Sequence, residues 1–133
     1  MSNPPLFRMI DCLRLPVADL PAALAFYRDR LGLELLWRTA DAAGLQMAED
    51  ASELVLFTGE GNPEIDLLVD SADQAAEQFA AAGGSLLVPP FDIRIGLCTI
   101  VQDPWGNPLV LLDMSKGRLT VDTDKNVTGT AKP

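Results

Sequence analysis

The most informative absence in this sequence of 133 residues is histidine, which does not occur at all. Histidine is the commonest metal ligand and the side chain whose charge changes most readily near neutral pH. Any catalytic site must therefore use carboxylates, thiols, the single tyrosine or a bound cofactor. Positive charge is also scarce: 10 Lys and Arg residues face 19 Asp and Glu residues, for a net charge of -9. Such a chain repels phosphate backbones and anionic lipids, so no nucleic-acid partner is expected.

Long apolar runs and a cysteine framework are missing too. No segment approaches the roughly 20 apolar residues of a membrane-spanning helix, and MSNPPLFRMI lacks the organisation of a signal peptide. Cys12 and Cys98 make no disulfide framework, which fits a reducing cytoplasm. The sequence therefore predicts a cytoplasmic protein with no membrane partner. Its length is that of one domain, and its 48% hydrophobic residues suffice for a core.

What is present is a pattern that occurs twice, about fifty residues apart. The first copy, LRLPVADLPAALAFYRDRLGLELL, reads as an alternating strand, an aspartate, an amphipathic helix and a glycine. The second copy, IDLLVDSADQAAEQFAAAGGSLLV, repeats that order. In each half, further apolar or alternating runs follow, separated by turn residues. The sequence thus predicts an α+β fold of two tandem β-α-β-β-β modules, whose curved mixed sheets surround a cleft.

The boundaries of these parts follow from the same pattern. Module one is expected over about residues 9–58, a linker over 59–63 and module two over about 64–114. Residues 115–133 are polar and are expected to form a tail with no clear contribution to the core. The whole chain, 1–133, is then a single domain.

Strand alternation assigns side chains to the two faces of each sheet. The residues expected to pack under the helices are Leu13, Leu15, Val17, Leu54, Leu56, Ile65, Leu67 and Val69. The residues expected to face the cleft are Cys12, Arg14, Pro16, Glu53, Val55, Phe57, Glu64, Asp66, Leu68, Val110 and Leu112.

Candidate ligand-binding residues include two arginines and four aromatic rings. Arg14 and Arg94 could each bind a carboxylate in a bidentate manner, but ion pairing with the surplus carboxylates is the favoured interpretation. The rings that could stack on a planar ligand are Trp37, Phe57, Phe91 and Trp105. The last of these lies in the turn DPWGN, where it could equally cover only the turn.

Cys12, Glu64 and Asp66 complete the candidate ligand-binding residues. The thiol of Cys12 could act as a nucleophile, but no histidine is present to activate it, so a small packed residue is the favoured interpretation. Cys98 is expected to be packed as well. Glu64 and Asp66 could perform acid–base chemistry if burial raised one of their pKa values towards neutrality. Otherwise they are expected to pair with Arg14.

These motifs together resemble the vicinal oxygen chelate superfamily, which includes glyoxalase I, extradiol dioxygenases and the fosfomycin- and bleomycin-resistance proteins. The resemblance covers about residues 9–116 and rests on VADLPAALAFYRDRLGLELLWR, VDSADQAAEQFAAAGG and FDIRIG…VQDPWGNPLVLLD. It implies paired modules, commonly a homodimer, with ligand sites in the concave sheets. In metal-dependent members, histidines and glutamates at four positions bind the metal. The corresponding positions here are Cys12, Val55, Glu64 and Val110.

This set of four departs from the family pattern. The two valines donate nothing to a cation, and one thiol with one carboxylate falls short of the three or four protein ligands that such sites use. Glu53 could replace Val55, which would give the alternative set Cys12, Glu53 and Glu64. The favoured prediction is no metal and no cofactor.

The resemblance is therefore nearest in type to the metal-free, bacterial bleomycin-resistance branch, whose members sequester a ligand. It implies a homodimer that binds a small organic molecule without a metal, in the manner of an antibiotic-resistance protein. The alternative is an enzyme, a glyoxalase-type lyase, isomerase or dioxygenase with an altered metal set.

Overall fold

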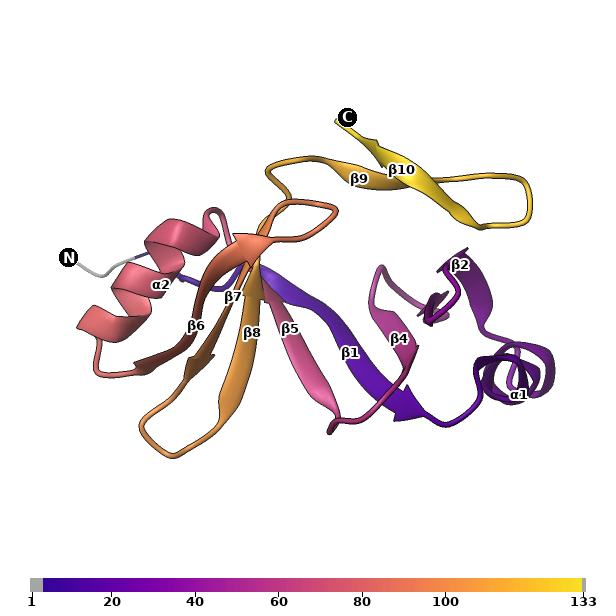
Figure 1. The fold of residues 1–133 in the computed structure, drawn as a ribbon, viewed down its shortest axis with the longest axis horizontal. Helices are drawn as coiled ribbons and strands as arrows, with labels where there is room; N and C mark the ends of the chain where they lie inside the picture. Colours follow the sequence, from indigo (N-terminus) through magenta and orange to yellow (C-terminus); the bar gives the residue numbers. More distant parts are fainter. Residues whose placement is uncertain (1–3, 133) are drawn as a thin grey trace. The chain divides into compact units, whose positions relative to one another are not determined.

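The computed structural model describes residues 4–132, which form two compact units. The first combines residues 11–64 with 120–129, and the second combines residues 4–10, 65–119 and 130–132 of the described chain. Figure 1 shows the elements of each unit along the chain. Among the described residues, no helix is long and apolar enough to cross a membrane.

Module one is a four-stranded sheet with one helical segment. Its elements are β1 (Met9–Val17), α1 (Leu20–Leu24), the π-helical continuation η1 (Ala25–Arg30), β2 (Glu34–Arg38), β3 (Ala42–Gln46) and β4 (Glu53–Thr58). The strand order is β2-β3-β4-β1, with β1 parallel to β4 and the other pairs antiparallel. Asp19 starts the helix because its carboxylate accepts a hydrogen bond of 3.0 Å from the N–H of Ala22.

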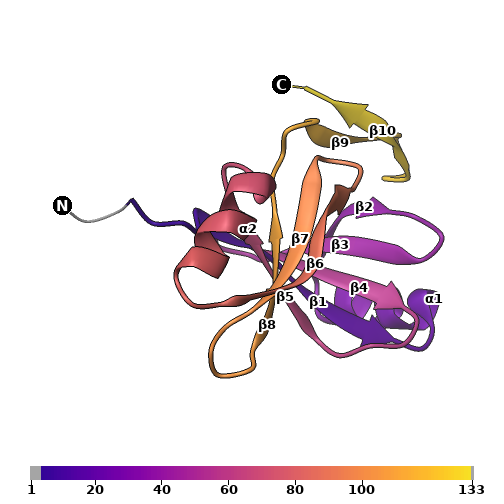
Figure 2. The ribbon, with the colours of Figure 1, turned by 60° about the vertical axis from the view of Figure 1, so that its left-hand side comes forward.

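Module two repeats this plan. Its elements are β5 (Glu64–Leu68), α2 (Ala72–Ala81), β6 (Ser85–Asp92), β7 (Leu97–Gln102) and β8 (Pro108–Leu112). The strand order is β5-β8-β7-β6, with β5 parallel to β8, and Figure 2 shows α2 beside this sheet. Ser71 caps α2 through a hydrogen bond from the N–H of Gln74. The predicted α+β class and the tandem β-α-β-β-β modules are confirmed.

Each module has a core between its helix and its sheet. The core of module one contains Leu20, Leu24, Ala43, Leu45, Leu54 and Leu56, and the core of module two contains Leu67, Val69, Ala75, Val101 and Leu111. A third cluster contains Cys98, Val110 and Leu112, which alternate with the residues of the second core. The prediction that Cys98 is packed is therefore confirmed.

The assignment of Leu13 and Ile65 to the helix side is wrong, because both are exposed. Leu13 is the middle residue of β1 and Ile65 the second residue of β5, whereas each helix begins after the end of its strand. The helix therefore covers only the later residues of the strand. Leu15 and Val17 pack against the first core, as predicted.

A buried carboxylate joins three segments of module two. The side chain of Asp113, which is only 3% exposed, accepts hydrogen bonds from the N–H groups of Ala72 at 2.8 Å and Leu97 at 2.9 Å. It also accepts one of 2.7 Å from the hydroxyl of Ser115. Gly96 leaves room for it, since a Cβ there would collide with Asp113. This aspartate therefore ties the start of α2 to the start of β7 and to the loop after β8.

The C-terminal segment is a hairpin where a polar tail was expected. Its strands are β9 (Arg118–Val121) and β10 (Val127–Ala131). The carboxylate of Asp122 accepts hydrogen bonds from the N–H groups of Asp124 and Asn126 and from the Asn126 side-chain amide. Aspartate and asparagine stabilise turns through such bonds. Hydrogen bonds to the carboxylate of Asp122 thus contribute to setting this turn.

Candidate functional site

The face of module one opposite its helix, called the open face below, gathers several of the predicted site residues. The registers pair Cys12 with Glu53 and Arg14 with Val55 across β1 and β4. Gly44 of β3 pairs with both Val55 and Trp37. Because residues paired across strands point to the same side of a sheet, these side chains share one face. By alternation, Phe57 lies there too.

Arg14 is held between an acidic and an aromatic neighbour. Its Nε lies 3.4 Å from Oε2 of Glu64, and its guanidinium carbon lies 5.0 Å from the centre of the Phe57 ring. One third of the arginine side chain is exposed. Of the two interpretations given for Arg14, ion pairing with a carboxylate is the one observed. A cation over a ring at this distance gains about 0.5–1 kcal/mol at exposed sites.

Trp37 is fixed by a carboxylate across the sheet. Its indole N–H donates a hydrogen bond to Oε1 of Glu53, and this bond passes over Gly44. A Cβ at Gly44 would collide with both bonded atoms, so the contact requires a residue without a side chain. The sequence placed Glu53 on this face, but not its bond to Trp37. The signal that could have indicated it is the glycine in the middle of β3, since a glycine within a strand often marks a close approach of other atoms.

Burial shifts two acidic groups of this unit. It raises the pKa of Glu53, against the opposing effects of the Trp37 hydrogen bond and the Arg14 charge, while the nearby Asp11 raises it further. Burial also raises the pKa of Asp11, which a hydrogen bond with Cys12 partly offsets. Cys12 is itself buried, in keeping with a packed strand residue.

The raised pKa of Glu53 predicts a pH-dependent signal from Trp37. In a Trp105→Phe background, Trp37 emission should change with a midpoint above 4.5, the ordinary glutamate value. The folded protein then binds the Glu53 proton more tightly than the unfolded chain, so this group's contribution to stability is lost as the pH rises through that range. A fluorescence titration measures the effect. The Glu53→Gln variant should show no such transition, and an unchanged transition in that variant would contradict the assignment.

The other predicted residues belong to the second compact unit. Asp66 is buried in β5, and Phe91 is partly exposed on β6. Arg94 follows β6, and its carbonyl oxygen accepts a hydrogen bond from the Thr130 hydroxyl. Trp105 is 83% exposed in the turn between β7 and β8. The structure therefore brings together only Cys12, Arg14, Trp37, Phe57 and Glu64 in one unit.

The residues at the family's metal positions do not fit a metal ion. Val55 and Val110 are buried apolar side chains, and the Glu64 carboxylate is engaged by Arg14. Within residues 4–132, no three histidine, cysteine, aspartate or glutamate side chains are grouped so that they could hold a metal ion. The alternative set of Cys12, Glu53 and Glu64 is therefore not assembled.

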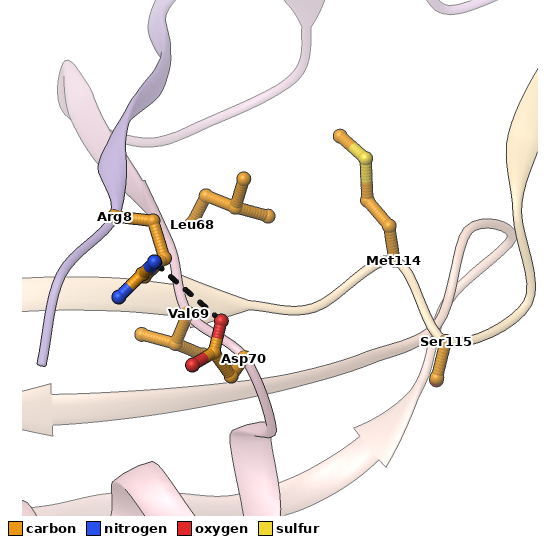
Figure 3. A pocket seen from close by; sticks show the side chains of 6 residues that line it. All are labelled: Arg8, Leu68, Val69, Asp70, Met114 and Ser115. Carbon is orange, nitrogen blue, oxygen red and sulfur yellow. Dashed lines mark ion pairs between the residues drawn. The ribbon is translucent and has the colours of Figure 1, made fainter.

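A pocket in the second unit contains none of the predicted site residues. It is lined by Arg8, Leu68, Val69, Asp70, Met114 and Ser115 (Figure 3). Nε of Arg8 lies 3.5 Å from Oδ1 of Asp70, and both side chains are at least half exposed. Such exposed ion pairs contribute about 1 kcal/mol or less. The pocket therefore offers no buried polar group that would orient a ligand.

The fold and the open face define a protein of paired β-α-β-β-β modules that lacks the usual metal-binding side chains. The model of the Glyoxalase/Bleomycin resistance protein/Dioxygenase superfamily matches residues 9–111, and the chain belongs to this superfamily, the vicinal oxygen chelate proteins. A comparison with curated proteins finds no match.

Solved structures share the fold at low sequence identity. Methylmalonyl-CoA epimerase from Mycobacterium tuberculosis superposes with a TM-score of 0.73 at 18% identity, covering 86% of this chain and 93% of that chain. A hypothetical protein from Bacillus halodurans gives 0.68 at 17% identity, with 84% and 97% covered. Homoprotocatechuate 2,3-dioxygenase from Brevibacterium fuscum, in complex with 3,4-dihydroxyphenylacetate, gives 0.64 at 24% identity. There 83% of this chain is covered but only 37% of the dioxygenase.

Proposed function

We propose that the protein binds a small organic molecule without a metal ion and sequesters it, as a homodimer with its ligand in a cleft. The observation that carries this proposal is the replacement of metal-binding side chains by Val55 and Val110, both buried. A metal-dependent reaction of the family's usual kind would lack its ligands here. Binding needs only a shaped surface with aromatic area and a few fixed polar groups.

The open face supplies these elements for a planar ligand. The indole of Trp37 is hydrogen-bonded to Glu53, and the guanidinium of Arg14 lies over the ring of Phe57. Rings that are already fixed lose little conformational freedom when a flat molecule stacks on them, which favours affinity. Partial exposure of Arg14 leaves room for a hydrogen bond to the ligand.

Fluorescence titration tests the binding. The Trp105→Phe variant leaves Trp37 as the only indole, so emission reports on the open face. We expect at least one compound in a panel of planar aromatic and anionic molecules to produce a saturable change. The Arg14→Gln variant should weaken binding of an anionic compound about tenfold, because a charged hydrogen bond is lost. A panel in which no compound perturbs Trp37 would count against the proposal.

Metal loading separates binding from the competing enzymatic function, a glyoxalase-type lyase, isomerase or dioxygenase. This alternative is favoured by the names of two similar structures, an epimerase and a dioxygenase. Protein equilibrated with Mn, Fe, Ni or Zn salts and freed of excess ions should contain much less than one metal per chain. A stoichiometric metal that is lost in the Glu64→Gln variant would favour the enzyme instead.

A further inference from the structure

The C-terminal hairpin lies beyond residues 9–111, the segment matched by the superfamily. Its closed end, residues 120–129, belongs to the same compact unit as module one. The N–H of Arg38, the last residue of β2, donates a hydrogen bond of 2.8 Å to the carbonyl oxygen of Lys125. Arg38 also forms a parallel bridge with Asn126. Figures 1 and 2 both draw this end of the hairpin beside β2.

This contact stabilises the end of β2, which is otherwise only partly held by its neighbouring strand. It is the outermost strand of the order β2-β3-β4-β1, so one of its edges has no neighbouring strand of module one. Its pairing with β3 is also interrupted between Leu35 and Trp37. An irregularity of this kind leaves a residue unpaired and bends the strand. After the irregularity, β2 pairs with β3 only at Trp37 and Arg38.

The conformation of the hairpin's closed end places the Lys125 carbonyl group at the Arg38 N–H. Lys125 has a φ of 70°, in the left-handed region, and its N–H donates to the carbonyl oxygen of Asp122 at 3.1 Å. The Asp122 carboxylate in turn receives three hydrogen bonds from Asp124 and Asn126. These bonds fix the turn locally, and none of them involves Arg38.

We propose that the C-terminal hairpin is a strap that positions Trp37. Lys125 holds the backbone of Arg38, and through it the end of β2 that carries the indole. Lys125 is a positioning residue, since it acts through the strand and not on the ligand. The expected effect of the strap on ligand affinity rests on the proposed function. Its restraint of Trp37 is independent of that function.

Two substitutions at one position test the strap in the full-length chain, in the Trp105→Phe background. Lys125→Val introduces a β-branched residue that disfavours φ near 70°, whereas Lys125→Gly adopts this φ readily. Both remove the same charge and keep the carbonyl group. In the valine variant, the Arg38 amide should exchange its hydrogen about tenfold faster, and acrylamide should quench Trp37 more strongly. The glycine variant should match the parent protein in both measurements.

Each other outcome overturns the proposal. Unchanged Arg38 exchange in the valine variant would mean that the hairpin does not restrain β2. If the Arg38 amide exchanged faster while the quenching of Trp37 stayed unchanged, the hairpin would protect the edge of β2 without positioning Trp37. Equal effects of valine and glycine would assign the effect to the lysine side chain. If the valine variant fails to fold, Asn126→Ala, which removes only a side-chain bond to Asp122, should give the same changes to a smaller degree.

Ligand affinity provides a further measurement. The panel compound that changes Trp37 emission most should bind several-fold more weakly to the valine variant than to the glycine variant. If no compound binds while hydrogen exchange and quenching respond as expected, the proposed function fails and the strap stands. If compounds bind equally well to both variants although Trp37 is loosened, only the link between strap and affinity fails.

Discussion

Replacing Asp113 by alanine is expected to lower the free energy of unfolding by about 2–4 kcal/mol. The substitution removes the buried acceptor of the Ala72 and Leu97 N–H groups and of the Ser115 hydroxyl. A buried donor such as the Ala72 N–H costs about 1–3 kcal/mol when it is left without a partner, and the partly buried Leu97 and Ser115 donors cost less because water can reach them. Urea-induced unfolding of the variant and the parent protein at pH 7, followed by circular dichroism, measures the difference.

Asp103 provides a matched control for this loss. Its carboxylate accepts hydrogen bonds from the N–H groups of Trp105 and Asn107 and from the Asn107 side chain, but in an exposed turn. Water can replace an exposed acceptor, so Asp103→Ala should cost about 1 kcal/mol or less. Equal losses in the two variants would contradict a special role for the buried carboxylate.

The effect of Asp113 should also depend on pH. Burial raises its pKa, but the hydrogen bonds from Ala72, Leu97 and Ser115 outweigh burial and lower the pKa below 3.8. The unfolded chain therefore takes up the proton first as the pH falls. The stabilisation is fully present above 3.8 and is lost as the pH falls through the folded-state pKa. The difference in stability between the parent protein and Asp113→Asn should accordingly shrink in acid.

Replacing Gly44 by alanine is expected to displace the Trp37 ring and so to abolish the ligand binding that we propose for the open face. The new Cβ would collide with the indole nitrogen and with the Glu53 oxygen that it contacts, so their hydrogen bond must break. Overpacking of this kind costs about 1–3 kcal/mol of stability. In the Trp105→Phe background, Trp37 emission and acrylamide quenching report the displacement, and titration with a compound that binds the parent protein reports the loss.

Gly129→Ala is the control for the effect of an added methyl group. Gly129 also lies in a strand, but a Cβ there would make only an ordinary contact with the Thr120 hydroxyl. This variant should keep the stability and the Trp37 emission of the parent protein. Unaltered Trp37 emission in Gly44→Ala would show that the ring does not depend on the space above this glycine.

The repeated pattern predicted the fold because its helix-capping residues and its alternation of apolar residues indicate the same elements. Asp19 and Ser71 cap their helices, and Leu54 and Leu56 lie in the core where alternation put them. The hairpin of residues 118–131 was not predicted. Its strands have no buried apolar face, so burial does not require an alternation of apolar and polar residues in them. Its turn depends on hydrogen bonds of Asp122 with residues up to four positions away.

The candidate site was predictable only in part. Alternation put Cys12, Arg14 and Phe57 on one side of the sheet, and their registers agree with this. The bond between Trp37 and Glu53 depends on the register of β2 against β3, which an irregularity shifts. No periodicity in the sequence marks that shift. The ion pair of Arg14 with Glu64, by contrast, is one of the pairings that the sequence led us to expect.

Strand β6 has a consequence for self-association. It is the outermost strand of the order β5-β8-β7-β6, and it contains Pro89 and Pro90. Proline has no N–H, so this stretch cannot supply a regular ladder to an added strand. At the outer edge of β2, the Arg38 N–H is already bound by Lys125. Both features disfavour the addition of a strand from another chain, at the outer edge of β6 and at the end of β2.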